Sequence, residues 1–512
     1  MKNKHVWSAD LGNGSYRNPI LYADYSDPDV VRVEDDYFMV ASSFSNSPAL
    51  PLLHSKDLVS WKVVNYVLDR IPCRDYDLPA HGRGVWAPAI RYHGNRFWVV
   101  FPMPDEGIFC CTAVDPFGKW SDPFPIFEGK GWIDPCPFWD DDGRAYLVNA
   151  FAFSRSGIKS TLHLSEMKPD CTGLLGGGKQ IIDGHDTQPT LEGPKLYKRN
   201  GYYYIFAPAG GVKHGWQTAF RAKDIWGPYE EKIVLFQGSA PVNGPHQGGW
   251  VTTQTGEDWF IHFQDVGACG RILHLQPVRW GNDWPVIGSD TQNQGIGQPV
   301  MTGKKPNVGR EYPPVFPADS DEFDGETLGL QWQWNANQQK KWYSLGGGAL
   351  TLRAQVYDGM LCDMPNLLLQ KFPAPGFLAT VKINISFLTG GDTAGLMVLG
   401  GLYGCAAVCK TDAGFDFARY TGHIGRNDEV KTVVSHANIT GELYLRLEVR
   451  NGGECNLSYS IDNVNYIPVG ECFETSAGVW VGAKFGLFCI GKTGAGALTA
   501  NWVHVEPLPD GE

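Results

Sequence analysis

Three carboxylates occupy the same place in three similar segments of this sequence. Asp27 lies in "SDPDVVRV", Asp134 in "IDPCPFW" and Glu192 in "LEGPKLY". Each stands at the head of a short apolar strand, ahead of a turn rich in Gly, Asp or Asn and a second, aromatic strand. A buried carboxylate without a partner is costly, so these residues are either solvated at strand ends or placed there for chemistry. Carboxyl groups held near one another can act as general acid and general base.

The segments belong to a repeat that runs through the first 300 residues. Five copies begin at polar or aromatic heads separated by 48 to 59 residues, namely Asp27, Trp86, Asp134, Glu192 and His246. A strand-built repeat of this length predicts a five-bladed β-propeller with about four strands per blade. The amphipathic helices of a parallel α/β fold are missing between the strands. Since the first strand of each propeller blade lines the central channel, the five heads should converge at one end of the axis.

Each of these residues, taken singly, can also be explained as an ordinary turn or strand residue without a role in function. Asp-Pro is a common turn dipeptide, and it also occurs at Asp115 and Asp122, out of phase with the repeat. The 18 Trp and 21 Tyr residues suit sugar-binding clefts and ordinary strands equally well. Only the shared phase of the three carboxylates favours a functional site.

The composition excludes several classes of partner. A net charge of −12 without a basic stripe argues against nucleic acid and gives no support for binding to anionic membranes. The N-terminal residues lack an apolar signal region, so we expect a cytoplasmic protein, or a secreted or periplasmic one if a signal was removed. The 12 cysteines show no CxxC pair and are expected to be reduced thiols.

The amino-acid composition of the chain changes near residue 300. Residues 1–300 are assigned to the propeller, and residues 301–318, which are polar and rich in Gly and Pro, to a linker. Residues 319–512 contain short alternating strands at regular spacing, such as "GALTLRAQ" and "LYLRLEVR", which predict a β-sandwich. The fold class is therefore all-β, a five-bladed propeller followed by a sandwich.

Several of these words, in this order, resemble glycoside hydrolase family 43. They are "YSDPDVVRV", "HSKDLVSW", "GVWAPAIRYHGNRFWVVF", "WIDPCPFWDDDGRAYLV", "LEGPKLYKRNGYYYIFAPAGG" and "NGPHQGGWV", followed by "GRILHLQPVRW". The resemblance implies a five-bladed propeller that acts on xylose and arabinose linkages. "DEFDGETLGLQWQW" resembles the opening of the concanavalin-like (jelly-roll) C-terminal domain of family 43 xylosidases, from which a loop can close the pocket.

The same resemblance assigns roles to the three carboxylates. Asp27 is expected to be the general base, Glu192 the general acid, and Asp134 the group that orients the acid and modulates its pKa. An inverting glycosidase holds acid and base roughly 6.5–9.5 Å apart, so that a water fits beside the anomeric carbon. A neighbouring carboxylate would raise the pKa of the acid.

Further residues are expected to bind substrate. Trp86 and Phe44 would form apolar walls, Arg271 would donate to sugar hydroxyls, and Trp216 in "GGVKHGWQ" belongs to a candidate specificity loop. Core packing or a structural ion pair is the alternative for these residues. His246 resembles the channel histidine of the family, which can hold a structural calcium through water, or it is a buried hydrogen-bonded histidine. The chemistry itself requires no cofactor.

The sequence thus predicts an inverting exo-glycosidase that releases terminal β-D-xylose, α-L-arabinofuranose or both. Its substrates would be xylan- or arabinan-derived oligosaccharides of the plant cell wall. An endo-arabinanase and a non-catalytic glycan-binding propeller are the alternatives, and a homo-oligomer stays open.

Overall fold

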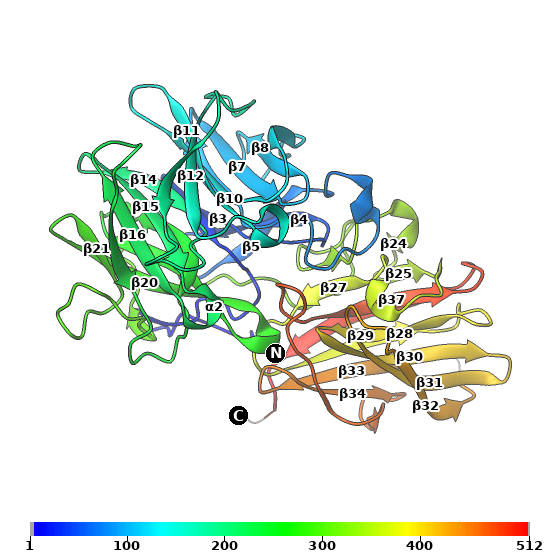
Figure 1. Ribbon diagram of the computed structural model, residues 1–512. Helices are drawn as coiled ribbons and strands as arrows, with labels where there is room; N and C mark the ends of the chain where they lie inside the picture. Colours follow the sequence, from blue (N-terminus) through cyan, green and yellow to red (C-terminus); the bar gives the residue numbers. More distant parts are fainter. Residues whose placement is uncertain (1–4, 440, 510–512) are drawn as a thin grey trace.

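Five antiparallel sheets of four strands surround a common axis in the first part of the chain (Figure 1). The computed structural model describes residues 5–439 and 441–509. Blades 1 and 2 consist of β2 (Asp29–Val33), β3 (Asp36–Val40), β4 (Ala49–Ser55) and β5 (Lys62–Leu68), then β6 (Ala89–His93), β7 (Arg96–Met103), β8 (Gly107–Ala113) and β9 (Phe124–Glu128). Blade 3 consists of β10 (Trp132–Trp139), β11 (Ala145–Phe151), β12 (Thr161–Met167) and β13 (Lys179–Asp183).

The last two blades repeat the same order. Blade 4 consists of β14 (Lys195–Arg199), β15 (Tyr202–Ala209), β16 (Trp216–Ala222) and β17 (Glu230–Leu235). Blade 5 consists of β18 (His246–Thr252), β19 (Asp258–Asp265), β20 (Arg271–Gly281) and β21 (Trp284–Ile287). The hairpin between β14 and β15 turns through Asn200 and Gly201, both at positive φ, as a two-residue hairpin loop requires. The predicted five-bladed propeller is confirmed.

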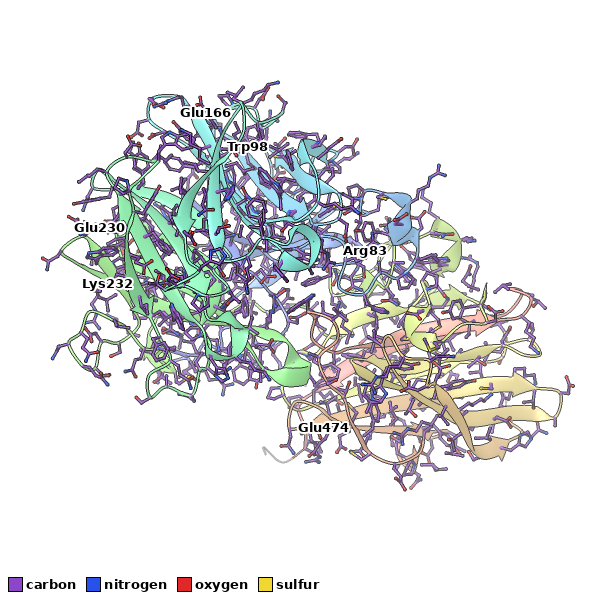
Figure 2. The ribbon with its side chains drawn as sticks, viewed as in Figure 1. Arg83, Trp98, Glu166, Glu230, Lys232 and Glu474 are labelled. Atoms are coloured by element: carbon purple, nitrogen blue, oxygen red, sulfur yellow. The ribbon has the colours of Figure 1, made fainter. Side chains whose placement is uncertain are left out.

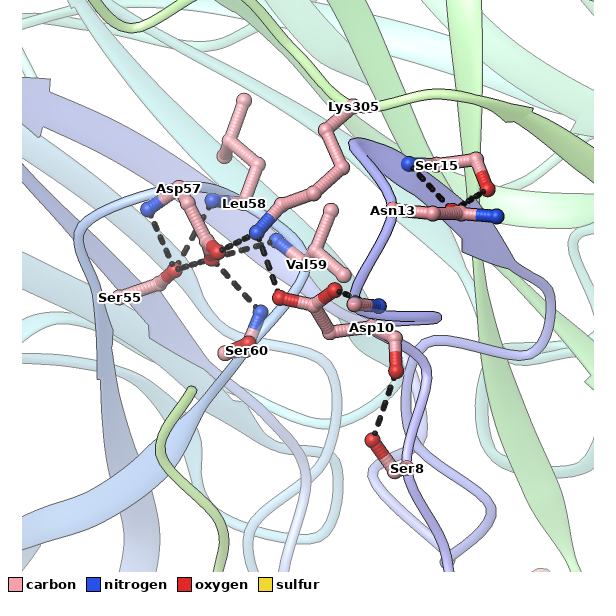
Figure 3. Close-up of polar contacts among 11 residues, drawn as sticks. Ser8, Asp10, Asn13, Ser15, Ser55, Asp57, Leu58, Val59, Ser60 and Lys305 are labelled. Atoms are coloured by element: carbon pink, nitrogen blue, oxygen red, sulfur yellow. Dashed lines mark hydrogen bonds and ion pairs between the residues drawn. The ribbon is translucent and has the colours of Figure 1, made fainter. Parts of the chain in front are cut away.

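A small sheet brings the N-terminal segment and the linker together. β1 (Ser15–Arg17) pairs with β22 (Thr302–Lys304). Beside this pair the ammonium group of Lys305 lies 2.7 Å from Asp10 and 2.8 Å from Asp57 of blade 1, as Figure 3 shows. Both carboxylates are largely buried, and the ion pairs fasten the two ends of the propeller segment to blade 1.

The second domain is a sandwich of two eight-stranded sheets. The first sheet contains β23 (Gln333–Trp334), β26 (Gln355–Val356), β27 (Leu368–Lys371), β37 (Lys484–Gly491), β29 (Thr393–Leu399), β30 (Leu402–Thr411), β31 (Gly414–His423) and β32 (Val430–Ala437). The second contains β24 (Tyr343–Leu345), β25 (Leu350–Arg353), β38 (Ala497–Glu506), β28 (Phe377–Asn384), β33 (Glu442–Arg450), β34 (Glu454–Ser460), β35 (Ile467–Pro468) and β36 (Phe473–Glu474). The inward-facing side chains of both sheets form one apolar core, which confirms the predicted sandwich.

The two domains are hydrogen-bonded to each other. Ser47 of the propeller and Trp334 of the sandwich exchange two backbone hydrogen bonds, of 3.1 and 2.6 Å. The side chain of Asn337 is held between the backbone N–H and C=O of Ile71, at 2.8 and 3.0 Å. Figure 2 shows Arg83 on the side of the propeller that faces the sandwich, and Glu230 and Lys232 on the far edge. The junction therefore fixes the position of the sandwich against blades 1 and 2.

The described residues include two short α-helices, α1 (Phe153–Ser156) and α2 (Gly211–His214). Neither these nor any other helix in the described part of the chain is long and apolar enough to cross a membrane.

Candidate active site

The heads of four of the five blades line one pocket at the end of the propeller axis, and the fifth, His246, is not among the lining residues. Asp27, Asp134 and Glu192 line it together with Phe44, Trp86 and Arg271. The pocket has a volume of about 440 Å³, which lies within the range of small-molecule sites. The structure thus brings together carboxylates that are separated by more than fifty residues in the chain.

Backbone conformation aims two of the carboxylates at the pocket. Asp27 precedes β2 and has a φ of 57°, and Asp134 has a φ of 55° at an irregularity in β10 between Ile133 and Cys136. A residue with a side chain adopts positive φ only at a cost, so the surrounding fold must hold these conformations. Glu192 lies three residues before β14 and donates its backbone N–H to Pro208.

Asp27 is fixed by two donors. The guanidinium of Arg271 donates to Oδ1 at 2.8 Å, and the Ser42 hydroxyl donates to Oδ2 at 2.6 Å. Both Asp27 and Arg271 are buried. A carboxylate with both oxygens engaged in this way has a defined orientation, which a general base needs.

The protonation of Asp134 is perturbed by its surroundings. Burial raises its pKa to about 7, and repulsion by Glu192 and Asp27 acts in the same direction. The backbone N–H of Gly193 donates to Oδ2 at 2.8 Å and partly offsets the rise. Gly193 has a φ of 61°, and a Cβ there would lie 2.9 Å from the Gln247 side chain. Glycine thus permits the close approach through which residue 193 holds Asp134.

Glu192 lies beside His246. Its Oε1 is 2.9 Å from Nε2 of His246, and its side chain is 35% exposed while the histidine is buried. Glu192 is therefore the most accessible of the three carboxylates, as a group that must reach a substrate oxygen needs to be.

The residues around His246 are a poor fit to the expected calcium ion. Its Nε2 already faces Glu192, and its Nδ1 is buried with no protein partner. Within residues 5–439 and 441–509 no group of three or more His, Cys, Asp or Glu side chains is arranged to hold a metal. Calcium prefers six to eight oxygen ligands, so the tentative metal role of His246 gains no support from this geometry.

An aromatic wall closes one side of the pocket and includes a residue of the sandwich. The rings of Phe44 and Trp86 lie 6.0 Å apart, and Trp480 lies 6.5 Å from Trp86 and within 5.7 Å of the Arg271 guanidinium. Trp480 belongs to the loop between β36 and β37 and is 52% exposed. The guanidinium of Arg155 in α1 lies over the Trp86 ring, 5.1 Å from its centre.

The candidate specificity loop contributes a different residue from the expected one. Val212 of α2 lines the pocket, whereas Trp216 donates its Nε1 to Gln188 and is not among the lining residues. Other lining residues were not anticipated either, among them Phe153, Gln247 and Trp480. Gln247 follows a predicted head directly, so the repeat could have indicated it.

Comparisons with known proteins agree with this geometry. Residues 16–285 match the family model described as glycosyl hydrolases family 43, and residues 320–506 match the beta xylosidase C-terminal concanavalin A-like domain. A Xylanibacter ruminicola protein, named provisionally as a beta-xylosidase, is 40% identical over 93% of this chain and 86% of its own length.

Two further relatives extend the comparison. A non-reducing end alpha-L-arabinofuranosidase of Bacteroides ovatus is 30% identical over 77% of this chain and 75% of its own length. The crystal structure of the GH43 BlXynB protein from Bacillus licheniformis is 26% identical, with a TM-score of 0.81 over 96% of this chain and 99% of that one. The names of the Xylanibacter and Bacteroides relatives divide between the two sugar specificities.

Proposed function

Because this chain belongs to glycosyl hydrolase family 43, we propose that it is an inverting exo-glycosidase. It releases terminal β-D-xylose, α-L-arabinofuranose or both from xylan- or arabinan-derived oligosaccharides. The observation that carries the proposal is the meeting of Asp27, Asp134 and Glu192 in one pocket. Relatives named for both sugars support this substrate class.

The proposed reaction uses side chains of the protein and one attacking water. Asp27, fixed by Arg271 and Ser42, takes a proton from the water that attacks the anomeric carbon. The bond between that carbon and the glycosidic oxygen breaks, and Glu192 gives its proton to the departing oxygen. Asp134 gives no proton to the substrate; in the singly protonated form of the pair that is competent for hydrolysis it is ionised, and its charge favours the proton on Glu192. Inversion follows because water and leaving group occupy opposite faces of the sugar.

Two hydrogen-bond donors at the pocket have no protein acceptor and are available to bind sugar hydroxyls. The indole Nε1 of Trp86 and the amide Nε2 of Gln247 are buried without a protein acceptor, and both residues line the pocket. A buried donor without a partner costs free energy, which a substrate hydroxyl can recover. They join Arg271, whose guanidinium lies at the pocket beside Asp27.

Trp480 supports exo action over cleavage within a chain. The loop that carries it comes from the sandwich and lies against Arg271 and Trp86, so the pocket is walled where an open cleft would continue. An endo-arabinanase would need such an open cleft.

Hydrolysis of matched substrates tests the proposal. The wild-type protein is expected to release p-nitrophenol from the β-D-xylopyranoside, the α-L-arabinofuranoside or both, and to shorten linear oligosaccharides from one end. NMR of the first product should show the inverted anomer. A retained anomer would refute the mechanism, internal cleavage would favour the endo alternative, and glycan binding without hydrolysis would favour a non-catalytic propeller.

A further inference from the structure

Lys195 is a fully buried cation close to the three carboxylates. Its side chain has 0% exposed area, and its Nζ donates to the backbone oxygen of Pro88 at 3.1 Å. Among the residues that the structure describes, no carboxylate oxygen lies within the 4.0 Å limit of an ion pair with this Nζ. A buried ammonium group is costly to desolvate, and one neutral carbonyl compensates little of that cost. The electrostatic field of more distant carboxylates must therefore offset this desolvation cost.

The path of the side chain points to the source of that field. Lys195 begins β14 in blade 4, whereas Pro88 immediately precedes β6 in blade 2. Blade 3, which carries Asp134, lies between them, so the side chain crosses the inner edge of blade 3. The short segment 192–195 thus supplies Glu192, the Gly193 N–H that holds Asp134, and the Lys195 cation.

The charges that act on Asp134 have opposite effects. Glu192 and Asp27 raise the pKa of Asp134, and Lys195 lowers it. Glu192 lies beside His246 and solvent, and the charge of Arg271 also acts on it. Two other largely buried cations near the axis have carboxylate partners: Arg91 lies 2.6 Å from Asp29, and Arg271 lies 2.8 Å from Asp27. Of these three cations in the described part of the chain, Lys195 is therefore the one without an ion-pair partner, and it acts on Asp134 from the buried side.

We propose that Lys195 is a positioning residue that directs the proton shared by Asp134 and Glu192 onto Glu192. This inference rests on the proposed function, in which Glu192 is the general acid. Two close carboxyls titrate as a pair, and the form competent for hydrolysis carries one proton. A cation beside Asp134 favours the carboxylate there and so leaves the proton on Glu192. Lys195 itself gains and loses no bond in the reaction.

Loss of the charge should produce a specific kinetic pattern. The shared proton would move to Asp134, and the ionised Glu192 could no longer protonate a departing sugar oxygen. A p-nitrophenolate leaving group needs little protonation, so the aryl glycoside should suffer less than the disaccharide. Both macroscopic pKa values of the pair would rise, which moves the pH profile of kcat to higher pH.

The experiment compares three variants in the full chain. Lys195→Gln keeps a donor for Pro88 and removes the charge, Lys195→Met removes both, and Lys195→Arg keeps the charge. The matched control is Lys198→Gln on the same strand, where the lysine is partly exposed and pairs with Asp140 outside the pocket. For each protein, kcat and KM are measured with the disaccharide and the p-nitrophenyl glycoside of the sugar that the wild type releases, across the pH range.

The neutral variants should lose at least about tenfold in kcat on the disaccharide relative to the aryl glycoside, since a bias of one pKa unit changes a population tenfold. Their profiles should move to higher pH, and Lys195→Arg and Lys198→Gln should stay near the wild type. Equal losses on both substrates with an unmoved profile would overturn the inference. The inference would also be overturned if Lys195→Arg folded and both neutral variants did not, since the charge would then serve stability.

The two proposals fail in different ways. If Glu192→Gln shows no dependence on the leaving group, the assignment of the general acid is wrong and Lys195 loses its role with it. If Glu192→Gln shows that dependence and Lys195→Gln does not, only the role of Lys195 is refuted.

Discussion

The guanidinium of Arg271 donates to Oδ1 of Asp27 at 2.8 Å, from a strand that lies in another blade and 244 residues later in the chain. The contact joins the first and the last blade of the propeller at the pocket. Arg271 also donates its backbone N–H to Asp24 at 2.9 Å, so its position is fixed at both ends. The proposed base is thus held by the closure of the propeller ring itself.

Replacing this arginine should impair catalysis. The substitution Arg271→Lys would keep the positive charge but lose the planar guanidinium that reaches Asp27. A hydrogen bond to a charged group contributes about 1.5–3 kcal/mol, so kcat/KM should fall roughly 10- to 100-fold. Arg279→Lys on the exposed part of β20 is the matched control. Similar activity in both variants would contradict the role of Arg271.

Glu192→Gln should separate substrates by their leaving groups. General acid catalysis contributes on the order of 10²–10⁴ in rate, and this contribution should disappear for xylo- or arabino-oligosaccharides. Activated aryl glycosides should keep more of their rate, because their leaving groups depart without protonation. Steady-state kinetics on both substrates measure the effect, and equal retention would count against Glu192 as the acid.

The raised pKa of Asp134 should appear in the stability of the protein. The unfolded group titrates near 3.8 and the folded group at about 7, so the folded state binds the proton more tightly. This contribution to stability is fully present below the unfolded pKa and is lost as pH rises through the folded pKa. The Tm of the wild type, relative to Asp134→Asn, should therefore fall between about pH 4 and pH 7. A constant difference across that range would argue against the buried, perturbed carboxyl.

Much of this site could be predicted because it repeats. Asp27, Asp134 and Glu192 share one phase of the repeat, and a propeller converts a shared phase into a shared place. Trp480 has no such signal, since it reaches the pocket from a loop of the other domain. The placement of Val212 rather than Trp216 at the pocket depends on how α2 turns ahead of β16, which no periodicity encodes.

The protonation of the site could not be predicted from the sequence either. The structure identifies Asp134 as a carboxyl with a raised pKa, an effect that the sequence did not place on this residue. Burial decides this, and burial of Asp134 arises from packing among three blades. Likewise, Lys195 and Lys198 lie on one short strand and look equivalent in sequence, yet Lys195 is fully buried and Lys198 is partly exposed and paired with Asp140.

Trp480→Ala should weaken binding of oligosaccharides. The exposed indole adds apolar area to the pocket beside Trp86, and stacking on an aromatic ring is worth about 0.5–1.5 kcal/mol beyond area burial. KM for short oligosaccharides should rise several-fold, with kcat for aryl glycosides changed less. Phe387→Ala removes an exposed ring of the same domain that does not line the pocket, and serves as control. Unchanged KM in Trp480→Ala would show that the sandwich loop does not contact substrate.

Gly270→Ala should disturb the contact between that loop and the propeller without replacing a residue of the pocket. Gly270 has a φ of 72°, and a Cβ there would lie 2.6 Å from Cα of Gly482 and 2.6 Å from Oδ1 of Asp24. The Gly482 atom is backbone, and the Asp24 oxygen is held by the backbone N–H of Arg271. The backbone of residues 476–482 or of Arg271 must therefore move. We expect a lower Tm and a higher KM for oligosaccharides.

Gly281→Ala is the matched control for this change, because a Cβ at Gly281 meets no atom within 4 Å and its φ is not positive. Gly270 immediately precedes β20 and Gly281 ends it. Thermal unfolding and steady-state kinetics of the two variants therefore compare a substitution at a tight contact between the domains with one at an open position near the same strand. Wild-type behaviour of Gly270→Ala in both measurements would mean that the sandwich loop does not depend on this close approach for its place at the pocket.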